Sequence, residues 1–140
     1  MSSSFDECRV LAIPCYTDQR GSLSVLDGPP ILPFEPKRFY YLYNLPADAH
    51  RGCHAHKTEM ELIMALAGRF KVTVNNGEST REFELTSPDQ GLYVPPLVWH
   101  DIYGFAPGSV CGVVASQRYN PDDYYHVYEE FLHALRQRAF

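Results

Sequence analysis

The chain has 140 residues, of which 45% are hydrophobic, a size and composition that suit one domain with its own core. Its net charge of -5 at pH 7 and a pI of about 5.6 argue against the basic stripe that nucleic-acid phosphates require, although a few arginines can still bind a small anion. The opening MSSSFDECRV carries acids and no apolar run, and no segment is long enough to span a bilayer, so we expect a cytoplasmic protein without a nucleic-acid or membrane partner.

Short runs rich in aromatic and β-branched residues recur through most of the chain and predict β-strands. In order they are RVLAIP (9–14), GSLSVLD (21–27), RFYYLYNL (38–45), ELIMALAG (61–68), RFKVTVNNG (69–77), REFELT (81–86), GLYVPP (91–96), DIYGF (101–105) and SVCGVVAS (109–116). Many closely spaced strands separated by turn residues indicate a sandwich or barrel. No repeat or boundary interrupts them, so residues 1–140 are expected to form a single domain.

Three local signals add to this strand pattern. Residues 27–37, DGPPILPFEPK, contain four prolines, which exclude a central strand and indicate a stiff connector. The alternation in FKVTVNNGESTREFEL breaks at Asn75-Asn76-Gly77, where a positive φ is tolerated, and predicts a hairpin turn. After Pro121 the apolar spacing becomes helical and predicts a C-terminal helix packed on the barrel wall. The residues at this spacing are Tyr124, Val127, Tyr128, Phe131, Leu132 and Leu135.

The segment RGCHAHKTEMELIMALAG, residues 51–68, places two histidines one residue apart. Alternate side chains of a strand share a face, so His54 and His56 point to the same side, and Gly52 leaves room for a group to approach them. Two imidazoles that face one cavity are either used in chemistry or hydrogen-bonded within the barrel, and both interpretations remain open. The histidines that lack such companions, and are expected at the surface, are His50, His126 and His133.

The spacing around these histidines resembles the two signature motifs of the cupin superfamily, which consists of small double-sheet β-barrels. The first motif reads H-x-H-x4-E-x6-G and ends at Gly68, and the second follows Gly91 as Pro95-x4-His100. In metal-binding cupins these side chains surround one divalent ion, and the set here would be His54, His56, Glu61 and His100. Three nitrogens and one oxygen suit iron, manganese, nickel or zinc.

A second resemblance is closer and covers nearly the whole chain. Its segments are DQRG (18–21), RFYYLYN (38–44), RGCHAHK (51–57), GLYVPPLVWH (91–100) and DYYHVYEEF (123–131). They resemble the dTDP-4-oxo-6-deoxyglucose 3,4-ketoisomerases, metal-independent cupins of deoxysugar biosynthesis. The resemblance implies an all-β jelly-roll barrel with a C-terminal α-helix, a dTDP-sugar substrate and no cofactor. It also implies a homodimer that exchanges N-terminal strands between its subunits.

The D-x-R-G and R-G-x-H elements also resemble the related dTDP-sugar 3,5-epimerases, in which arginines hold the substrate and a histidine removes a proton. Two positions depart from the ketoisomerase pattern. Glu61 stands where those enzymes usually carry glutamine, which restores the acid of the metal-binding cupins. The usual D-Y-I-R near the C-terminus is D-Y-Y-H here, so His126 takes the last place. The first departure keeps a metal site open.

Moving a carbonyl from C4 to C3 of a hexose requires a base that removes the C3 proton, and a proton that returns to C4 through an enediol. An imidazole suits this step because its ordinary pKa lies near neutrality. The resemblance assigns the base to His54, with His56 close enough to share the proton. Tyr40 is a candidate for hydrogen-bonding the sugar oxygens or passing a proton, although a tyrosine in such a strand is equally often a core residue.

Negative charge that develops on the enediolate oxygens is stabilised by fixed donors, for which our candidates are Arg51, His56 and His100. Arg20 is expected to hold the diphosphate or the sugar, because a guanidinium fork matches phosphate oxygens. The complete set of expected substrate-binding residues is Arg20, Arg51, His100 and Lys57. The combination of an arginine at 20 and a histidine at 100 resembles the members that form the galacto product.

Two other functions remain open on the sequence. The first is a metal-dependent cupin enzyme, in which Glu61 is a ligand instead of a partner for His56 or for a nearby arginine. The second is a non-catalytic cupin that binds a nucleotide sugar and leaves it unchanged. Metal content distinguishes the metal-dependent enzyme from a metal-independent isomerase. Hydrogen exchange at C3 of the sugar distinguishes the isomerase from the non-catalytic cupin, which would show none.

Overall fold

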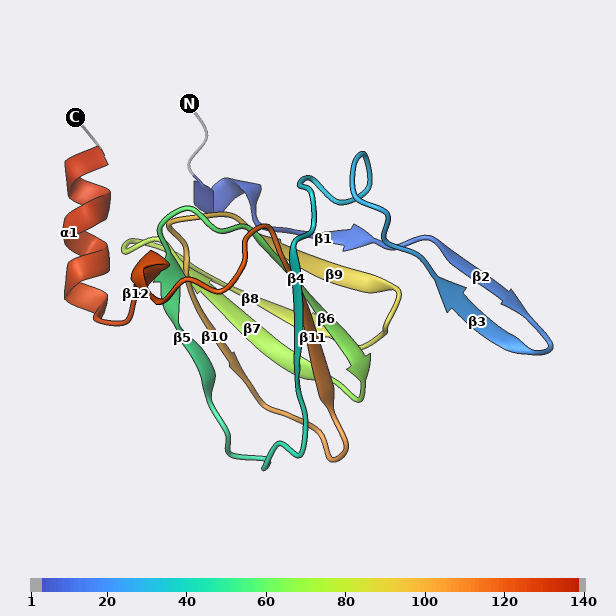
Figure 1. Ribbon diagram of the computed structural model, residues 1–140. Helices are drawn as coiled ribbons and strands as arrows, with labels where there is room; N and C mark the ends of the chain where they lie inside the picture. Colours follow the sequence, from blue (N-terminus) through green and yellow to red (C-terminus); the bar gives the residue numbers. More distant parts are fainter. Residues whose placement is uncertain (1–3, 139–140) are drawn as a thin grey trace.

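Two five-stranded antiparallel sheets and one separate hairpin make up the fold (Figure 1). The computed structural model describes residues 4–138. Across the first sheet the strands are β1 (Arg9–Ala12), β9 (Gln90–Val94), β6 (Glu61–Ala67), β11 (Val110–Ala115) and β4 (Arg38–Leu42). Across the second they are β12 (Tyr124–Tyr125), β5 (Arg51–His56), β10 (Trp99–Tyr103), β7 (Phe70–Asn75) and β8 (Thr80–Leu85). The remaining elements are β2 (Cys15–Asp18), β3 (Gly21–Ser24), the 3-10 turns Ser4–Glu7 and Pro121–Asp123, and the helix α1 (Tyr128–Arg138).

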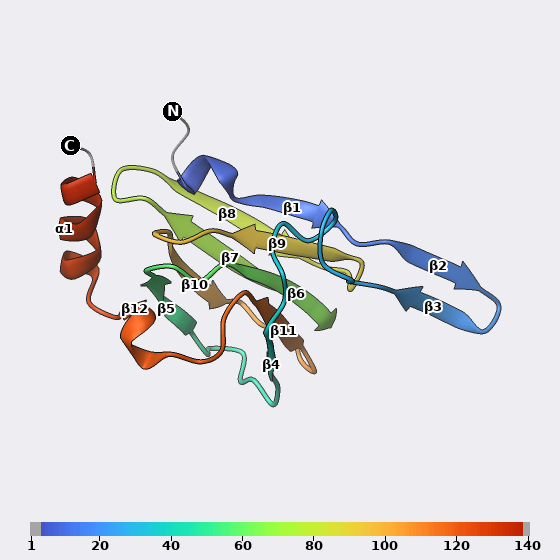
Figure 2. The ribbon, with the colours of Figure 1, turned by 45° about the horizontal axis from the view of Figure 1, so that its top comes forward.

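The predicted all-β class with one C-terminal helix is confirmed, but the barrel is not closed. Within residues 4–138 no strand ladder joins one five-stranded sheet to the other. The hairpin of β2 and β3 projects from the sandwich at the end away from α1, as both ribbon views show (Figure 2). In the same part of the chain, no helix has the length and apolar character needed to cross a membrane.

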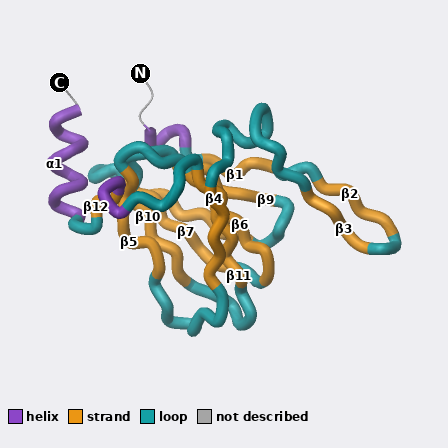
Figure 3. The backbone as a smooth tube through the Cα atoms, in the orientation of Figure 1, coloured by secondary structure: helices purple, strands orange, loops and turns teal. Residues whose placement is uncertain are grey.

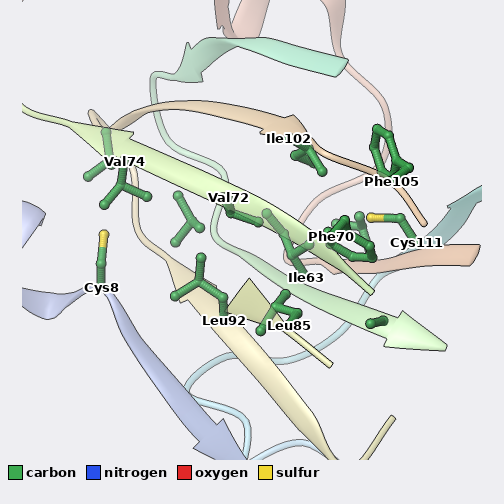
Figure 4. Packing of buried hydrophobic residues seen from close by; sticks show 14 of the residues in the cluster. Cys8, Ile63, Phe70, Val72, Val74, Leu85, Leu92, Ile102, Phe105 and Cys111 are labelled. Atoms are coloured by element: carbon green, nitrogen blue, oxygen red, sulfur yellow. The ribbon is translucent and has the colours of Figure 1, made fainter. Parts of the chain in front are cut away.

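The main core lies between the two sheets and draws alternate residues from each (Figure 4). In β7, for example, Phe70, Val72 and Val74 are buried while the residues between them are only partly covered. Each fully buried apolar side chain of this size contributes about 1.5–3 kcal/mol. This core holds the sheets face to face and thereby sets the distance between β4 and β5, where the candidate site lies.

The proline-rich segment 27–37 is more than the stiff connector that the sequence predicts. Its Leu32 and Phe34 are buried on the outer face of the first sheet, against Leu62 and Met64 of β6. Consequently β6 is covered on both faces, which explains why its sequence, ELIMALA, is apolar at consecutive positions instead of alternate ones.

The hairpin predicted at Asn75-Asn76-Gly77 is confirmed. Strands β7 and β8 pair with Asn75 opposite Thr80, and Gly77 adopts a φ of 91°. The Asn76 side chain accepts hydrogen bonds from the backbone N–H groups of Glu78 and Ser79, at 2.9 and 2.7 Å. Asparagine caps of this kind satisfy turn donors that the strand ladder leaves free.

The C-terminal helix begins later than its spacing predicts. Tyr124 is not helical: it belongs to β12 and pairs with His56 of β5, so the chain stays extended there before α1 starts. Val127 precedes the helix and is exposed. Phe131 is fully buried against Trp99, which confirms the predicted packing face of the helix (Figure 3 shows its place at the end of the sandwich).

Candidate active site

A cavity of about 370 Å³ opens between β4, the edge strand of the first sheet, and β5 of the second. Its lining residues are Arg38, Tyr40, Leu42, Arg51, Gly52, His54, His100, Ile102, Tyr119 and Tyr124. A larger groove of about 720 Å³ lies elsewhere, along α1. We place the site in the smaller cavity because the three clustered histidines adjoin it.

An irregularity in β5 brings these histidines together. His54 pairs with His100, but Gly52 pairs with the next residue of β10, so Cys53 is an extra residue in a β-bulge with a φ of 58°. Gly52 itself has a φ of 78°, and a Cβ there would lie 3.0 Å from the carbonyl oxygen of His100. Glycine is therefore required for the close approach of the two strands.

The rings of His54 and His56 are neighbours, as strand alternation predicts, with centroids 4.9 Å apart. The ring of His100 lies 4.7 Å from that of His54. The two histidines of β5 differ in their exposure to the cavity. His54 lines the cavity, whereas His56 is only 3% exposed and lies behind the lining.

Hydrogen bonding fixes the orientation and the tautomer of His54. Its Nδ1 lies 2.9 Å from the carbonyl oxygen of Gly52, which can only accept, so Nδ1 carries the proton and Nε2 keeps its lone pair. No hydrogen-bond partner satisfies that buried Nε2 within the described residues. Burial, followed by the nearby His100 and His56, lowers the pKa of His54 to about 3. The ring is therefore uncharged at neutral pH.

His56 has the opposite electrostatic environment. Burial disfavours its charged form, but the carboxylates of Glu61, Glu59 and Asp123 outweigh burial and raise its pKa. Its Nε2 lies 3.3 Å from Glu61, and its Nδ1 lies 3.4 Å from Glu59 and 3.6 Å from Asp123. The two adjacent histidines thus have opposite pKa shifts, lowered for His54 at the cavity and raised for His56 beneath it.

Glu61 is the hub of the buried polar network. The Tyr40 hydroxyl donates a hydrogen bond to its Oε2 at 2.8 Å, while its Oε1 lies 3.3 Å from His56 Nε2 and 3.6 Å from His100 Nε2. Burial favours the protonated acid, but the hydrogen bond and charge of His56 outweigh burial and lower the pKa of Glu61. Glu61 therefore remains a carboxylate and orients the Tyr40 hydroxyl at the cavity wall.

One atom from each of four side chains meets in this network, within 4.8 Å of one another: His54, His56, Glu61 and His100. Burial and the lack of hydrogen-bond partners at the Nε2 atoms of His54 and His56 and at Oε1 of Glu61 also fit a ligand set. These residues are therefore compatible with a divalent transition metal, which would act as a Lewis acid when bound.

The cavity has residues that the sequence reasoning missed. Arg38 lines it and forms an ion pair with Glu59 at 3.2 Å. Burial, together with the neighbouring Glu61, raises the pKa of Glu59 to about 7. Strand alternation was the available signal for Arg38, since residue 38 shares a face with Tyr40. Glu59 had no signal, because its contact with Arg38 joins residues 21 positions apart.

The C-terminal segment closes one wall of the cavity. The Asp123 carboxylate accepts hydrogen bonds from the backbone N–H groups of Thr58 and Glu59, at 3.0 and 3.1 Å, and from the Thr58 hydroxyl at 2.6 Å. This anchor places the next residue, Tyr124, with its ring 4.9 Å from that of His54 and 4.5 Å from that of His56. The predicted helix would have removed Tyr124 from this wall.

The predicted substrate-binding residues are distributed unevenly. Arg51 and His100 line the cavity. Lys57 lies in the groove along α1, with its ammonium 5.1 Å from the ring centre of Tyr125. Arg20 is at the tip of the projecting hairpin, where its side chain is 87% exposed and pairs with Asp18 at 2.6 Å. A single chain therefore does not bring Arg20 or Lys57 to His54.

The remaining histidines are exposed, as expected, but two of them contribute to the cavity mouth. His126 stacks on Tyr124 with ring centroids 5.0 Å apart, and His50 stacks on Tyr103 at 5.4 Å. Both line a second opening of about 370 Å³ that shares His54 and Tyr119 with the main cavity. The interpretation that these histidines lack companions is therefore wrong, since stacking across strands cannot be read from sequence spacing.

A two-sheet β fold that gathers three histidines and a glutamate beside one cavity defines a cupin-like protein. A TDP-4-oxo-6-deoxy-alpha-D-glucose-3,4-oxoisomerase of Aneurinibacillus thermoaerophilus is 36% identical over 125 residues, which cover 89% of this chain and 90% of that protein. Residues 6–136 match the family model described as FdtA: WxcM-like, C-terminal. The chain belongs to this family, the sugar 3,4-ketoisomerases.

Two mutant structures of the 3,4-ketoisomerase QdtA from Thermoanaerobacterium thermosaccharolyticum are also similar. One, with a histidine replaced by asparagine, holds TDP-4-keto-6-deoxyglucose and has a TM-score of 0.91 at 30% identity, covering 94% of this chain and 95% of that chain. The other, in which a tyrosine becomes arginine and an arginine becomes histidine, holds TDP. Its TM-score is 0.90 at 32% identity, with the same coverage.

Proposed function

We propose that the protein converts dTDP-4-oxo-6-deoxy-D-glucose to a dTDP-3-oxo-6-deoxyhexose, as a 3,4-ketoisomerase of deoxysugar biosynthesis. The observation that carries the proposal is the neutral His54, which lines a cavity of suitable size for a hexose and whose unprotonated Nε2 has no hydrogen-bond partner among the described residues. The kinship to a named 3,4-oxoisomerase and to QdtA supplies the substrate class.

The reaction moves one hydrogen between carbons and one between oxygens. His54 Nε2 takes the C3 proton, the electron pair forms the C3–C4 double bond of the enediolate, and the proton returns to C4. The hydroxyl proton of O3 ends on O4, for which the Tyr40 hydroxyl and His100 are the candidate carriers on the cavity wall. No electrons are exchanged with the protein, so the step needs no redox cofactor.

The low pKa of His54 describes the cavity without substrate. Negative charge on an enediolate beside the ring favours the imidazolium, because opposite charges attract more strongly in a site of low dielectric constant. The hydrogen bond from Nδ1 to Gly52 keeps the ring oriented while Nε2 gains and loses the proton.

Two exposed features support a homodimer in which the β2–β3 hairpin reaches the partner's cavity. Arg20 is displayed at the hairpin tip, and Phe39, Tyr41 and Tyr43 form a row of exposed aromatics on the edge strand β4 and just beyond it. Exposed apolar rows on an edge strand favour association. An exchange of hairpins would complete each site with a guanidinium from the other subunit.

The mutated positions of QdtA correspond in spacing to three candidate site residues of this chain. Along its chain the replaced tyrosine, histidine and arginine are separated by the same intervals that separate Arg20, His54 and His100 here. This chain carries arginine and histidine at the two outer positions, as the TDP-bound double mutant does. Together with the resemblance to galacto-forming members, this pair favours the galacto configuration at C4.

Complementation tests whether Arg20 acts across the dimer. Arg20→Ala and His54→Asn are each expected to lose activity, and refolding equal amounts together is expected to restore about one quarter of the wild-type rate, because half of the dimers then hold one intact site of two. A mixture as inactive as its components would place Arg20 outside the partner's site. Light scattering measures the oligomeric state directly.

Incubation with dTDP-4-oxo-6-deoxyglucose in D₂O tests the isomerase proposal. NMR is expected to show loss of the C3 hydrogen signal and formation of the 3-oxo sugar with wild-type protein, and neither with His54→Asn. Turnover that survives this substitution would reject His54 as the base. A bound sugar whose C3 hydrogen does not exchange would instead support the non-catalytic nucleotide-sugar-binding cupin.

The clustered ligand atoms of His54, His56, Glu61 and His100 favour a metal-dependent enzyme as the second candidate. Metal analysis of protein purified without added ions distinguishes it from the isomerase that needs no metal. Near-stoichiometric iron or manganese, lost together with activity on chelation and restored on re-addition, would establish the metal-dependent function. Full activity in metal-free protein would exclude it.

A further inference from the structure

Arg38 occupies a position on the cavity wall that the proposed mechanism does not yet use. It begins β4, and its side chain is only 16% exposed although it lines the cavity. Its guanidinium lies 5.1 Å from the ring centre of Tyr40 and 5.5 Å from that of Tyr119. Two aromatic faces therefore hold the planar cation in place.

Polar contacts fix the guanidinium further. Its Nη2 donates a hydrogen bond to Glu59 Oε2 at 3.2 Å and lies 4.0 Å from Glu61 Oε2. Arginine has five N–H donors. The Nε atom has no hydrogen-bond partner among the described residues, so these contacts do not exhaust the donors.

The location of Arg38 is unusual for a residue that only neutralises buried acids. Glu59 is 3% exposed, so an arginine whose only role was to neutralise the Glu59 carboxylate would not need to extend to the cavity surface. Arg51, the other arginine at the cavity, is exposed, whereas Arg38 is immobilised before any ligand binds. Donors that are already oriented stabilise developing charge most effectively, because they need no reorganisation during the reaction.

We propose that Arg38 contacts the keto sugar and donates hydrogen bonds to the O3 and O4 oxygens as negative charge develops on the enediolate. The inference rests on the proposed isomerase function and adds a residue that neither the motif reasoning nor the comparisons assign. Charge, planarity and a fixed position on the wall that also carries Tyr40 and Tyr124 are the properties that suit Arg38 to this role.

The direct test is the rate of C3 hydrogen exchange in Arg38→Gln and Arg38→Lys. Loss of one fixed donor to an oxyanion is expected to lower kcat about 10²- to 10³-fold in Arg38→Gln. Arg38→Lys keeps the positive charge but loses the planar, forked guanidinium, so its kcat should lie between that of Arg38→Gln and that of wild type. TDP lacks the sugar, so its affinity, measured by calorimetry, should not change.

Chemical rescue and a double variant separate substrate contact from a structural role. Methylguanidine is expected to restore part of the exchange in Arg38→Ala, and to leave Arg9→Ala unchanged, since Arg9 packs on Tyr93 away from the cavity. If Arg38 only neutralises Glu59, exchange should recover in Arg38→Gln/Glu59→Gln. We expect no recovery, with Glu59→Gln alone as the reference.

Two results would overturn the inference. Wild-type exchange rates in Arg38→Gln would show that the guanidinium is dispensable, and full recovery in the double variant would assign it to Glu59. If Arg38→Gln and Arg38→Ala fail to fold by circular dichroism, Arg38→Lys decides the question: an unchanged kcat rejects the contact. Absence of exchange in wild-type protein would reject the proposed function itself, which is a distinguishable outcome.

Discussion

Replacing Asp123 by alanine tests how far the C-terminal segment depends on one buried carboxylate. Its three hydrogen bonds reach Thr58 and Glu59 across 65 and 64 residues of sequence. Thr58 is exposed, so water can replace part of the hydrogen bonding that Thr58 loses in the variant. The buried backbone N–H of Glu59, by contrast, would have no acceptor. A stranded buried donor costs about 1–3 kcal/mol and each lost bond to a charged acceptor about 1.5–3 kcal/mol.

We therefore expect Asp123→Ala to lower the free energy of unfolding by about 2–4 kcal/mol, after allowing for solvation at Thr58. Asp123→Asn, which keeps one acceptor oxygen, should lose about half as much. Urea unfolding at a fixed protein concentration measures both values, and the matched control is Asp122→Ala, whose side chain is exposed. A loss below about 0.5 kcal/mol in Asp123→Ala would refute the anchoring role, because ordinary surface substitutions fall in that range.

Three further predictions concern the site and the helix. The pKa of His54 is about 3 in the folded protein and 6.5 in the unfolded chain, so the stability present above pH 6.5 is lost as the pH falls towards 3. Between pH 7 and pH 5 the free energy of unfolding of wild type, measured with urea, should fall by about 1–2 kcal/mol more than that of His54→Gln. Equal losses would contradict the depressed pKa. Gly52→Ala should lose about 1–2 kcal/mol and slow C3 exchange, because its φ is positive and its Cβ would press on the His100 carbonyl. Phe131→Ala should lose about 3–4 kcal/mol by calorimetry, against at most about 0.5 kcal/mol for the exposed Val127→Ala.

Local patterns predicted the parts of the fold that local interactions decide. The turn at Asn75-Asn76-Gly77 follows from side chains that satisfy the backbone within a few residues. The same reasoning wrongly predicted a helix at Tyr124. The helical spacing there competes with strand pairing to β5, which is distant in sequence. Long-range pairing prevailed there, supported by the buried Asp123.

The candidate site shows the same division. His54 and His56 could be located from alternation and motif spacing, and Tyr40 from the strand motif. The opposite pKa shifts of the two histidines could not, since they arise from burial and from the carboxylates around His56, among them Asp123, which is distant in sequence. Motif spacing alone did not place Arg20 outside the cavity of its own chain, although the family resemblance implied an exchange of the N-terminal strands that carry Arg20.

Burial of β6 on both faces has a consequence for how sequences of this kind can diverge. Residues 61–65, enclosed by the main core and by the segment carrying Leu32 and Phe34, have no solvent side on which a polar mutation is harmless. Substitutions should therefore accumulate most slowly in residues 61–65 and faster in β8, most of whose residues are exposed. Because Glu61 begins that constrained strand, selection on packing should remove changes at the residues that follow it, even where those changes leave the chemistry of the site intact.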